Sequence, residues 1–138
     1  MLGGTIFVQA NLKEACLMGS SLVQAQFREG TQLQAANLMG AKLTHALLPN
    51  ANLTRANLTR AILTHADLCQ ATLSAANLTC AYLKGINLRG ANLQNANLSF
   101  AHLAHADLTG ANLQGANLEG ANLSHATLLS ANLQQARL

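Results

Sequence analysis

A period of five residues governs the placement of apolar side chains along this chain. Every fifth residue from Leu33 to Leu138 is leucine without exception, and alanine stands two positions before nearly all of these leucines. The residue between alanine and leucine is most often asparagine, as in Ala51-Asn52-Leu53. The repeated unit is therefore an apolar, polar, apolar segment followed by two further residues.

This period does not suit a single straight helix or strand. Five residues turn an α-helix by about 500°, so the leucines would be distributed around all of its sides. On a strand, an odd step places successive leucines on opposite faces. If the chain instead turns a corner every five residues, alanine and leucine both point inward on each short extended segment. Stacked coils then share one core, so the pattern predicts a solenoid.

The run of Ala-Asn/Asp-Leu units resembles the pentapeptide-repeat proteins, and the resemblance covers essentially the whole chain. It implies an all-β fold, namely a right-handed quadrilateral β-helix (β-solenoid) with four pentapeptides in each coil. At that number of repeats per coil, the chain would form about seven coils. Such repeats are especially numerous in cyanobacteria, so the resemblance also implies a source of that kind.

The repeat predicts a single domain over residues 1–138. Residues 31–138 carry it in regular form. Residues 1–29 carry it in degenerate form, with leucine or phenylalanine at every fifth position from Leu2 to Phe27. Half of the residues are hydrophobic (50%) and few are charged (9%), which fits a narrow core of alanine and leucine.

One extra residue interrupts the period near the boundary between these two parts. The step from Phe27 to Leu33 is six residues instead of five. We expect the extra residue at Gly30, because glycine tolerates the backbone angles of a bulge. A short protruding loop from Arg28 to Gln32 is the alternative.

The lengths of the apolar runs and the positions of the cysteines argue against a membrane protein and a disulfide framework. No apolar run approaches the ~18 residues of a spanning helix, and no secretory signal is visible at Met1. We therefore expect a cytoplasmic location and no membrane partner, with the periplasm or a lumen as open alternatives. Cys16, Cys69 and Cys80 would not stack next to one another, which predicts free thiols.

No catalytic motif accompanies the repeat. The sequence has no phosphate-binding loop and no nucleophile elbow. Asp67 and Asp107 share a column but lie two coils apart, ~10 Å, which exceeds the spacing of paired catalytic carboxylates. We expect no enzymatic activity, no catalytic residues and no cofactor.

Four histidines share one column of the predicted coil. His45, His65, His105 and His125 each follow a leucine by two positions, at multiples of twenty residues, and Gly85 interrupts the column. Stacked imidazoles ~4.8 Å apart are able to chelate a transition metal as a pair. Since no carboxylate or cysteine completes a ligand set, we expect no metal site.

The same face departs from asparagine at the position before leucine. If these side chains point outward, as the resemblance implies, Ile62 and Tyr82 form an exposed apolar strip beside His102. Sequence drift on a tolerant surface is the alternative explanation. The outward residues of this face are Lys42, Ile62, Tyr82, His102 and Asn122. The candidate partner-binding residues are Ile62, Tyr82, His102, His45, His65, His105 and His125.

These features favour a non-enzymatic structural or interaction protein, a rigid rod that binds a protein partner through one face or through its ends. The resemblance offers an alternative, because some family members mimic duplex DNA and bind DNA topoisomerases. Such mimicry needs a strongly anionic surface. This chain has 8 Lys plus Arg against 5 Asp plus Glu, a net charge of +3, which disfavours it. The basic residues are scattered, so we expect no nucleic-acid partner either.

The end of the repeat suggests a mode of self-association. The last coil would present inward-facing leucines above strand edges that lack partners. Two such ends can cover each other about a two-fold axis, which predicts a homodimer through this end. The leucines concerned are Leu123, Leu128, Leu133 and Leu138.

Overall fold

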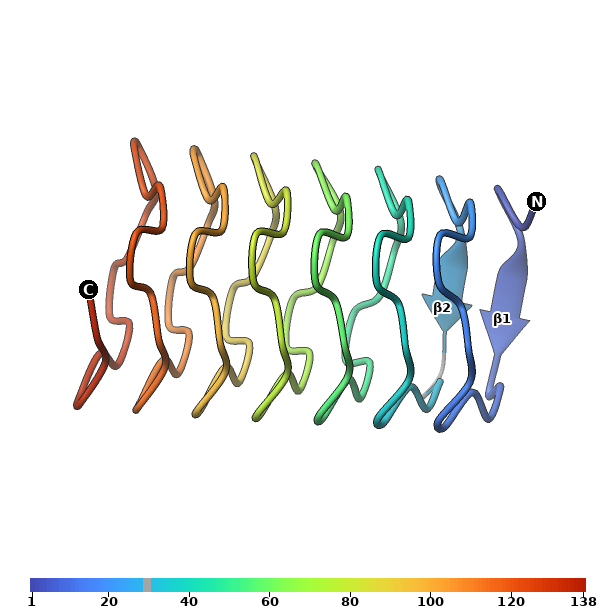
Figure 1. Cartoon of the computed structure of the whole chain (residues 1–138), viewed down its shortest axis with the longest axis horizontal. Helices are drawn as coiled ribbons and strands as arrows, with labels where there is room; N and C mark the ends of the chain where they lie inside the picture. The colour runs from blue at the N-terminus through green and yellow to red at the C-terminus, as the bar shows by residue number, and fades with distance from the viewer. Residues whose placement is uncertain (29–30) are drawn as a thin grey trace.

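The chain winds into a stack of short coils. The structure, a computed structural model, describes residues 1–28 and 31–138. Figure 1 shows the coils side by side along the longest axis, with the two termini at opposite ends of the stack. Two segments are continuous strands, β1 (Ile6–Val8) and β2 (Gln26–Arg28), and they pair in parallel. The described residues contain no helix, and the fold is an all-β solenoid.

Single parallel bridges join each coil to the next. From Gln32 onward, the residue before each leucine pairs with the residue twenty positions later, as Asn57 does with Asn77. A step of twenty residues equals four pentapeptides, so each coil has four short sides. The total number of coils and the handedness stay predictions.

The register of the pairing also locates the extra residue in the six-residue step from Phe27 to Leu33. Ile6 pairs with Gln26, twenty residues later, whereas Asn11 pairs with Gln32, twenty-one residues later. The additional residue therefore falls between β2 and Gln32. The bulge expected at Gly30 lies outside the described residues.

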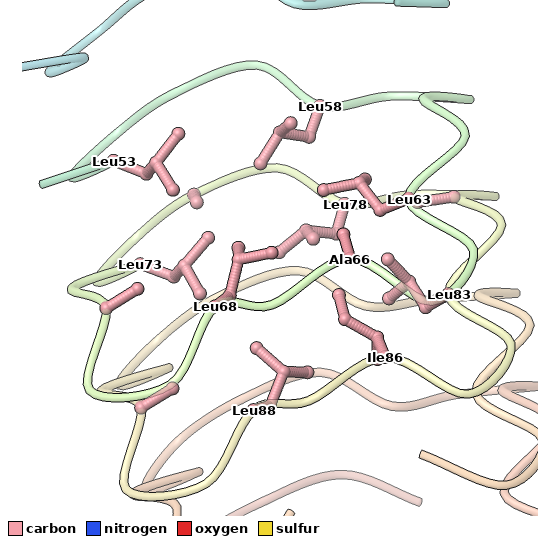
Figure 2. Close-up of a cluster of buried hydrophobic side chains, with 14 of the residues drawn as sticks. Leu53, Leu58, Leu63, Ala66, Leu68, Leu73, Leu78, Leu83, Ile86 and Leu88 are labelled. Carbon is pink, nitrogen blue, oxygen red and sulfur yellow. The ribbon is translucent and has the colours of Figure 1, made fainter. Parts of the chain in front are cut away.

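The core is a column of alanine and leucine side chains inside the coils. Successive residues of an extended segment point to opposite sides, so alanine and leucine point inward and the residue between them points outward. The inward-facing alanines and leucines between Leu22 and Leu118 are at most 2% exposed. Ile86 stands at an alanine position and is equally buried (Figure 2). Burial of each leucine contributes about 1.5–3 kcal/mol, which makes this column the main source of stability.

Backbone hydrogen bonds connect each coil to the next. The N–H of Leu53 donates to the carbonyl of Thr72 at 2.7 Å, and the N–H of Thr72 donates back to the carbonyl of Ala51 at 2.9 Å. The parallel pairing therefore satisfies the polar backbone along the sides of the solenoid.

The corners lie at the second position after each leucine or phenylalanine of the repeat. All described residues at this position have left-handed φ values, from 50° at Gln9 to 69° at Gly4. The N–H that follows the corner closes it, as Ala56 does by donating to the carbonyl of Leu53 at 2.9 Å. Asparagine is frequent before leucine because its side chain accepts a hydrogen bond from the corner, as Asn52 Oδ1 does from the Thr54 N–H at 3.1 Å.

We expect Leu93→Asp to abolish folding. Leu93 is fully buried in the middle of the stack, and an unpaired carboxylate there costs more than the ~5–15 kcal/mol by which a domain is stable. Far-ultraviolet circular dichroism and thermal unfolding measure the effect. Asn92→Asp is the matched control, because this neighbouring side chain points outward and its oxygen remains an acceptor for Gln94. A folded Leu93→Asp protein with the wild-type melting temperature would contradict the assigned core.

Candidate partner-binding face

One side of the solenoid gathers most of the unusual side chains, and we call it the histidine face. It is formed by residues 41–45, 61–65, 81–85, 101–105 and 121–125. Parallel bridges join its outward residues in the order Lys42, Ile62, Tyr82, His102 and Asn122. The twenty-residue step thus brings together side chains that are far apart in the sequence.

The centre of the histidine face is aromatic. Tyr82 is 49% exposed, and its ring stacks on that of His102 with centroids 4.9 Å apart and planes 8° from parallel. Ile62 is adjacent to Tyr82 across the coils, as predicted. It is only partly exposed, like most outward residues of the stack. The predicted strip of Ile62 and Tyr82 is therefore substantially exposed only at Tyr82.

The four corner histidines form two stacked pairs. The rings of His45 and His65 lie 5.5 Å apart, and those of His105 and His125 lie 5.0 Å apart, in both cases with nearly parallel planes. A Cβ added to Gly85 would lie 2.5 Å from Nδ1 of His65, so the imidazole of His65 occupies the space above the glycine. The His65 ring, from the preceding coil, thus fills the gap that Gly85 leaves in the histidine column.

An open groove lies along the corner that leads into the histidine face. Its volume is about 640 Å³, and its lining residues are Arg60, Cys80, Tyr82, Phe100, His102 and Gly120. Phe100 is 57% exposed. A Cβ added to Gly120 would lie 2.7 Å from the Phe100 ring, so the absence of a side chain at Gly120 gives that ring its place.

Sequence reasoning found Tyr82 and His102 but missed the remaining lining residues of this groove. Arg60, Cys80 and Phe100 are corner residues of the preceding side, each two positions before an outward residue of the histidine face. The five-residue period was sufficient to predict that these corner residues lie beside the histidine face, because the corner of one side adjoins the start of the next side. Only Gly120 required the structure, since its role depends on the direction in which Phe100 points.

The charge of the histidine face has one sign. It carries Lys42 and Lys84, all five histidines of the chain and no aspartate or glutamate. Arg60 adds a further cation at the groove. Bases therefore outnumber acids on this side far more strongly than in the whole chain.

The following side of the solenoid holds two of the five acids. Asp67 and Asp107 are separated by Asn87 in one column, and the Asn87 amide donates to Asp67 at 2.8 Å. Arg89 forms an ion pair with Asp107 at 3.1 Å. Hydrogen bonds from Thr109, together with the Arg89 cation, lower the pKa of the Asp107 carboxyl. Both carboxylates are thus engaged by neighbouring groups.

The cysteines are separate free thiols at Cys16, Cys69 and Cys80. Burial, followed by the negative charge of Asp67, raises the pKa of the Cys69 thiol. Within residues 1–28 and 31–138, no three His, Cys, Asp or Glu side chains gather as a metal-binding group. The same residues include no helix of the length and apolarity that crossing a bilayer requires.

The leucines of the last coil are more exposed than those of the stack. Leu123, Leu128 and Leu133 are partly buried, and Leu138 is 79% exposed. Association through this end stays a prediction.

Comparison with known families identifies the repeat. The family model for pentapeptide repeats matches residues 36–74, 76–115 and 101–138, with 8 copies. The chain therefore belongs to the pentapeptide-repeat family. Comparison with curated proteins gives no match.

Several solved structures share the fold. HetL, a pentapeptide repeat protein involved in heterocyst differentiation regulation in the cyanobacterium Nostoc sp. strain PCC 7120, is 33% identical. That alignment covers 99% of this chain and 73% of HetL, with a TM-score of 0.51. QnrB1, a plasmid-mediated fluoroquinolone resistance protein, is 18% identical over 96% of this chain and 84% of its own, with a TM-score of 0.60. A protein of the Arabidopsis thaliana thylakoid lumen is 24% identical over 88% and 70% of the two chains, with a TM-score of 0.58.

We expect Zn²⁺ or Ni²⁺ to change the melting temperature of the protein little. Each histidine pair supplies two ligands, whereas protein zinc sites use three or four. Thermal unfolding with and without metal tests this, with His45→Ala/His65→Ala as the control. A stabilisation of several degrees that disappears in the control would establish a metal site instead.

Proposed function

We propose that this protein is a non-enzymatic interaction protein that binds a protein partner through its histidine face. The observation that carries the proposal is the exposed Tyr82–His102 stack beside Phe100 in an open groove. Aromatic residues and arginine are enriched in the energetic centres of protein interfaces. Arg60 lines the same groove.

The distribution of aromatic residues supports this choice of face. The chain has one tyrosine, three phenylalanines and no tryptophan. Phe7 and Phe27 stack on each other at 4.8 Å within the first coils, and Phe27 is buried. The other two, Tyr82 and Phe100, are exposed and line one groove. The aromatic side chains that the core does not use are therefore gathered in one place.

The scaffold favours binding without large rearrangement. Backbone hydrogen bonds hold the coils on both sides of the groove, as in the bonds of Tyr82 N to Ala61 O and of Leu83 N to His102 O, both 2.9 Å. Binding to a preorganised surface loses less conformational freedom than binding that orders a loop. The groove is thus suited to a specific partner despite its modest size.

We expect the double variant Tyr82→Ala/Phe100→Ala to weaken partner binding by about tenfold or more, because each substitution removes an exposed aromatic side chain from the groove. Affinity capture from an extract of the source organism, followed by binding measurements with the captured protein, gives the readout. Gln70→Ala/Thr72→Ala is the matched control, with a corner and an outward residue changed on another side of the solenoid. Equal binding by the two variants would locate the contact elsewhere.

Mimicry of duplex DNA is the competing function, and the charges do not favour it. The similarity to QnrB1 lies at an identity that carries the fold alone. The net charge is +3, and Arg89 neutralises Asp107 on the side where two of the acids lie. A stand-in for the phosphate backbone requires the opposite charge.

We therefore expect no effect of this protein on DNA gyrase. A supercoiling assay with an excess of the purified protein should give the same rate as buffer, with and without a fluoroquinolone. QnrB1 in place of this chain is the comparison protein. Inhibition of supercoiling, or protection from the drug, would favour the DNA-mimic function over the proposed one.

A further inference from the structure

We infer that the histidine face binds an acidic segment of its partner, and that the affinity rises as the pH falls through the range in which histidine gains its charge. The inference rests on the proposed function, since it assigns the chemistry and the regulation of the same face. Its basis is the separation of charge types around the solenoid.

All five histidines of the chain belong to this face, together with Lys42 and Lys84, and no carboxylate accompanies them. The groove beside them adds the cation of Arg60. Histidine changes its charge between about pH 8 and pH 5. The histidine face thus gathers every histidine of the chain, the residue type that responds to pH in this range, where no aspartate or glutamate lies.

The acids nearest to the histidine face lie on the sides that precede and follow it. Asp107 is already paired with Arg89, and Asp67 accepts from the Asn87 amide, both on the following side. Glu119 lies on the preceding side, where its backbone carbonyl accepts from the Phe100 N–H at 2.9 Å. Further titratable or charged side chains on or beside the face are Arg60, Cys80 and Tyr82 at the groove, and Cys69 next to Asp67.

The stacked geometry couples protonation to anion binding. The paired rings lie 5.5 Å apart at His45 and His65, and 5.0 Å apart at His105 and His125. Two imidazolium groups at such a distance repel each other unless an anion lies beside them. A carboxylate has two acceptor oxygens and can accept from both rings. Bound carboxylates thus favour protonation, and by linkage protonation strengthens binding.

The orientation of the rings favours a peptide over a nucleic acid. Single-stranded nucleic acids bind by stacking bases on free aromatic faces. Here Tyr82 and His102 each cover one face of the other, and the corner histidines do the same within their pairs. The edges of these rings carry the positive part of the ring quadrupole and the O–H and N–H donors. Carboxylates complement such edges.

The probe for the test is a fluorescent heptapeptide in which three aspartates flank a phenylalanine on each side. At low salt, about 0.05 M, we expect its affinity to rise about tenfold or more from pH 7.5 to pH 5.5. A heptapeptide with asparagine in place of aspartate should bind weakly at both pH values. Fluorescence anisotropy of each peptide against the whole chain measures the affinities.

The histidine dependence is tested with His45→Asn/His65→Asn/His105→Asn/His125→Asn. Asparagine is chosen because it tolerates the positive φ of these corners, between 55° and 60°. We expect this variant to lose most of the rise in affinity between pH 7.5 and pH 5.5. Gln70→Asn/Gln135→Asn makes the same kind of change at corners of other sides and should keep the full rise. The two histidine pairs are also replaced separately, so that a folding defect in the fourfold variant leaves the test intact.

Three results would overturn the inference. They are an unchanged peptide affinity between the two pH values, equal binding of the aspartate and asparagine peptides, and tighter binding of an oligothymidylate of similar charge. If one of them occurs while Tyr82→Ala/Phe100→Ala still loses the captured partner, the proposed function stands and its acidic, pH-dependent form fails. If the peptide behaves as expected but capture is unchanged in that variant, the inferred chemistry stands and the aromatic groove is not the contact.

Discussion

The twenty-residue pairing between coils is the constraint on which the rest of this structure depends. It gives the backbone of each inner side hydrogen-bond partners in both adjacent coils, since the Thr72 N–H donates to Ala51 in the preceding coil and the Leu73 N–H donates to Asn92 in the following coil. It also places each inward leucine in register with the leucines of the adjacent coils, so that small units without a core of their own share one. Because side chains alternate, a slip of one residue would turn alanine and leucine toward solvent.

The same constraint divides the chain into positions with different freedom. Inward positions between Leu22 and Leu118 are closed to polar side chains, with Thr31 as a buried exception that bonds backbone carbonyls. Corner positions require a left-handed backbone but leave the side chain free. Outward positions face only solvent and the next coil. Chemistry specific to this protein is therefore confined to outward and corner positions, which is where Tyr82, Phe100 and the histidines lie.

The sequence was informative wherever a property follows from period alone. The leucine register predicts the core, and the spacing of His45 and His65 predicts their stacking. It was less informative where the direction of a side chain depends on its neighbour in another coil. Ile62 is only partly exposed, although its outward position predicts an exposed side chain. Phe100 leans over Gly120, and no local pattern encodes that contact.

A regular solenoid presents nearly the same surface at every coil, which affects how a partner recognises it. A partner that contacted only the asparagine columns would fit equally well after sliding by one coil, because residues such as Asn97 and Asn117 are equally half-buried and make the same hydrogen bond to the corner. Tyr82 is the only tyrosine of the chain, and Phe100 is the only phenylalanine outside the first two coils. These unrepeated side chains remove the translational ambiguity. The groove thus fixes where along the rod a partner sits, as well as how tightly it is held.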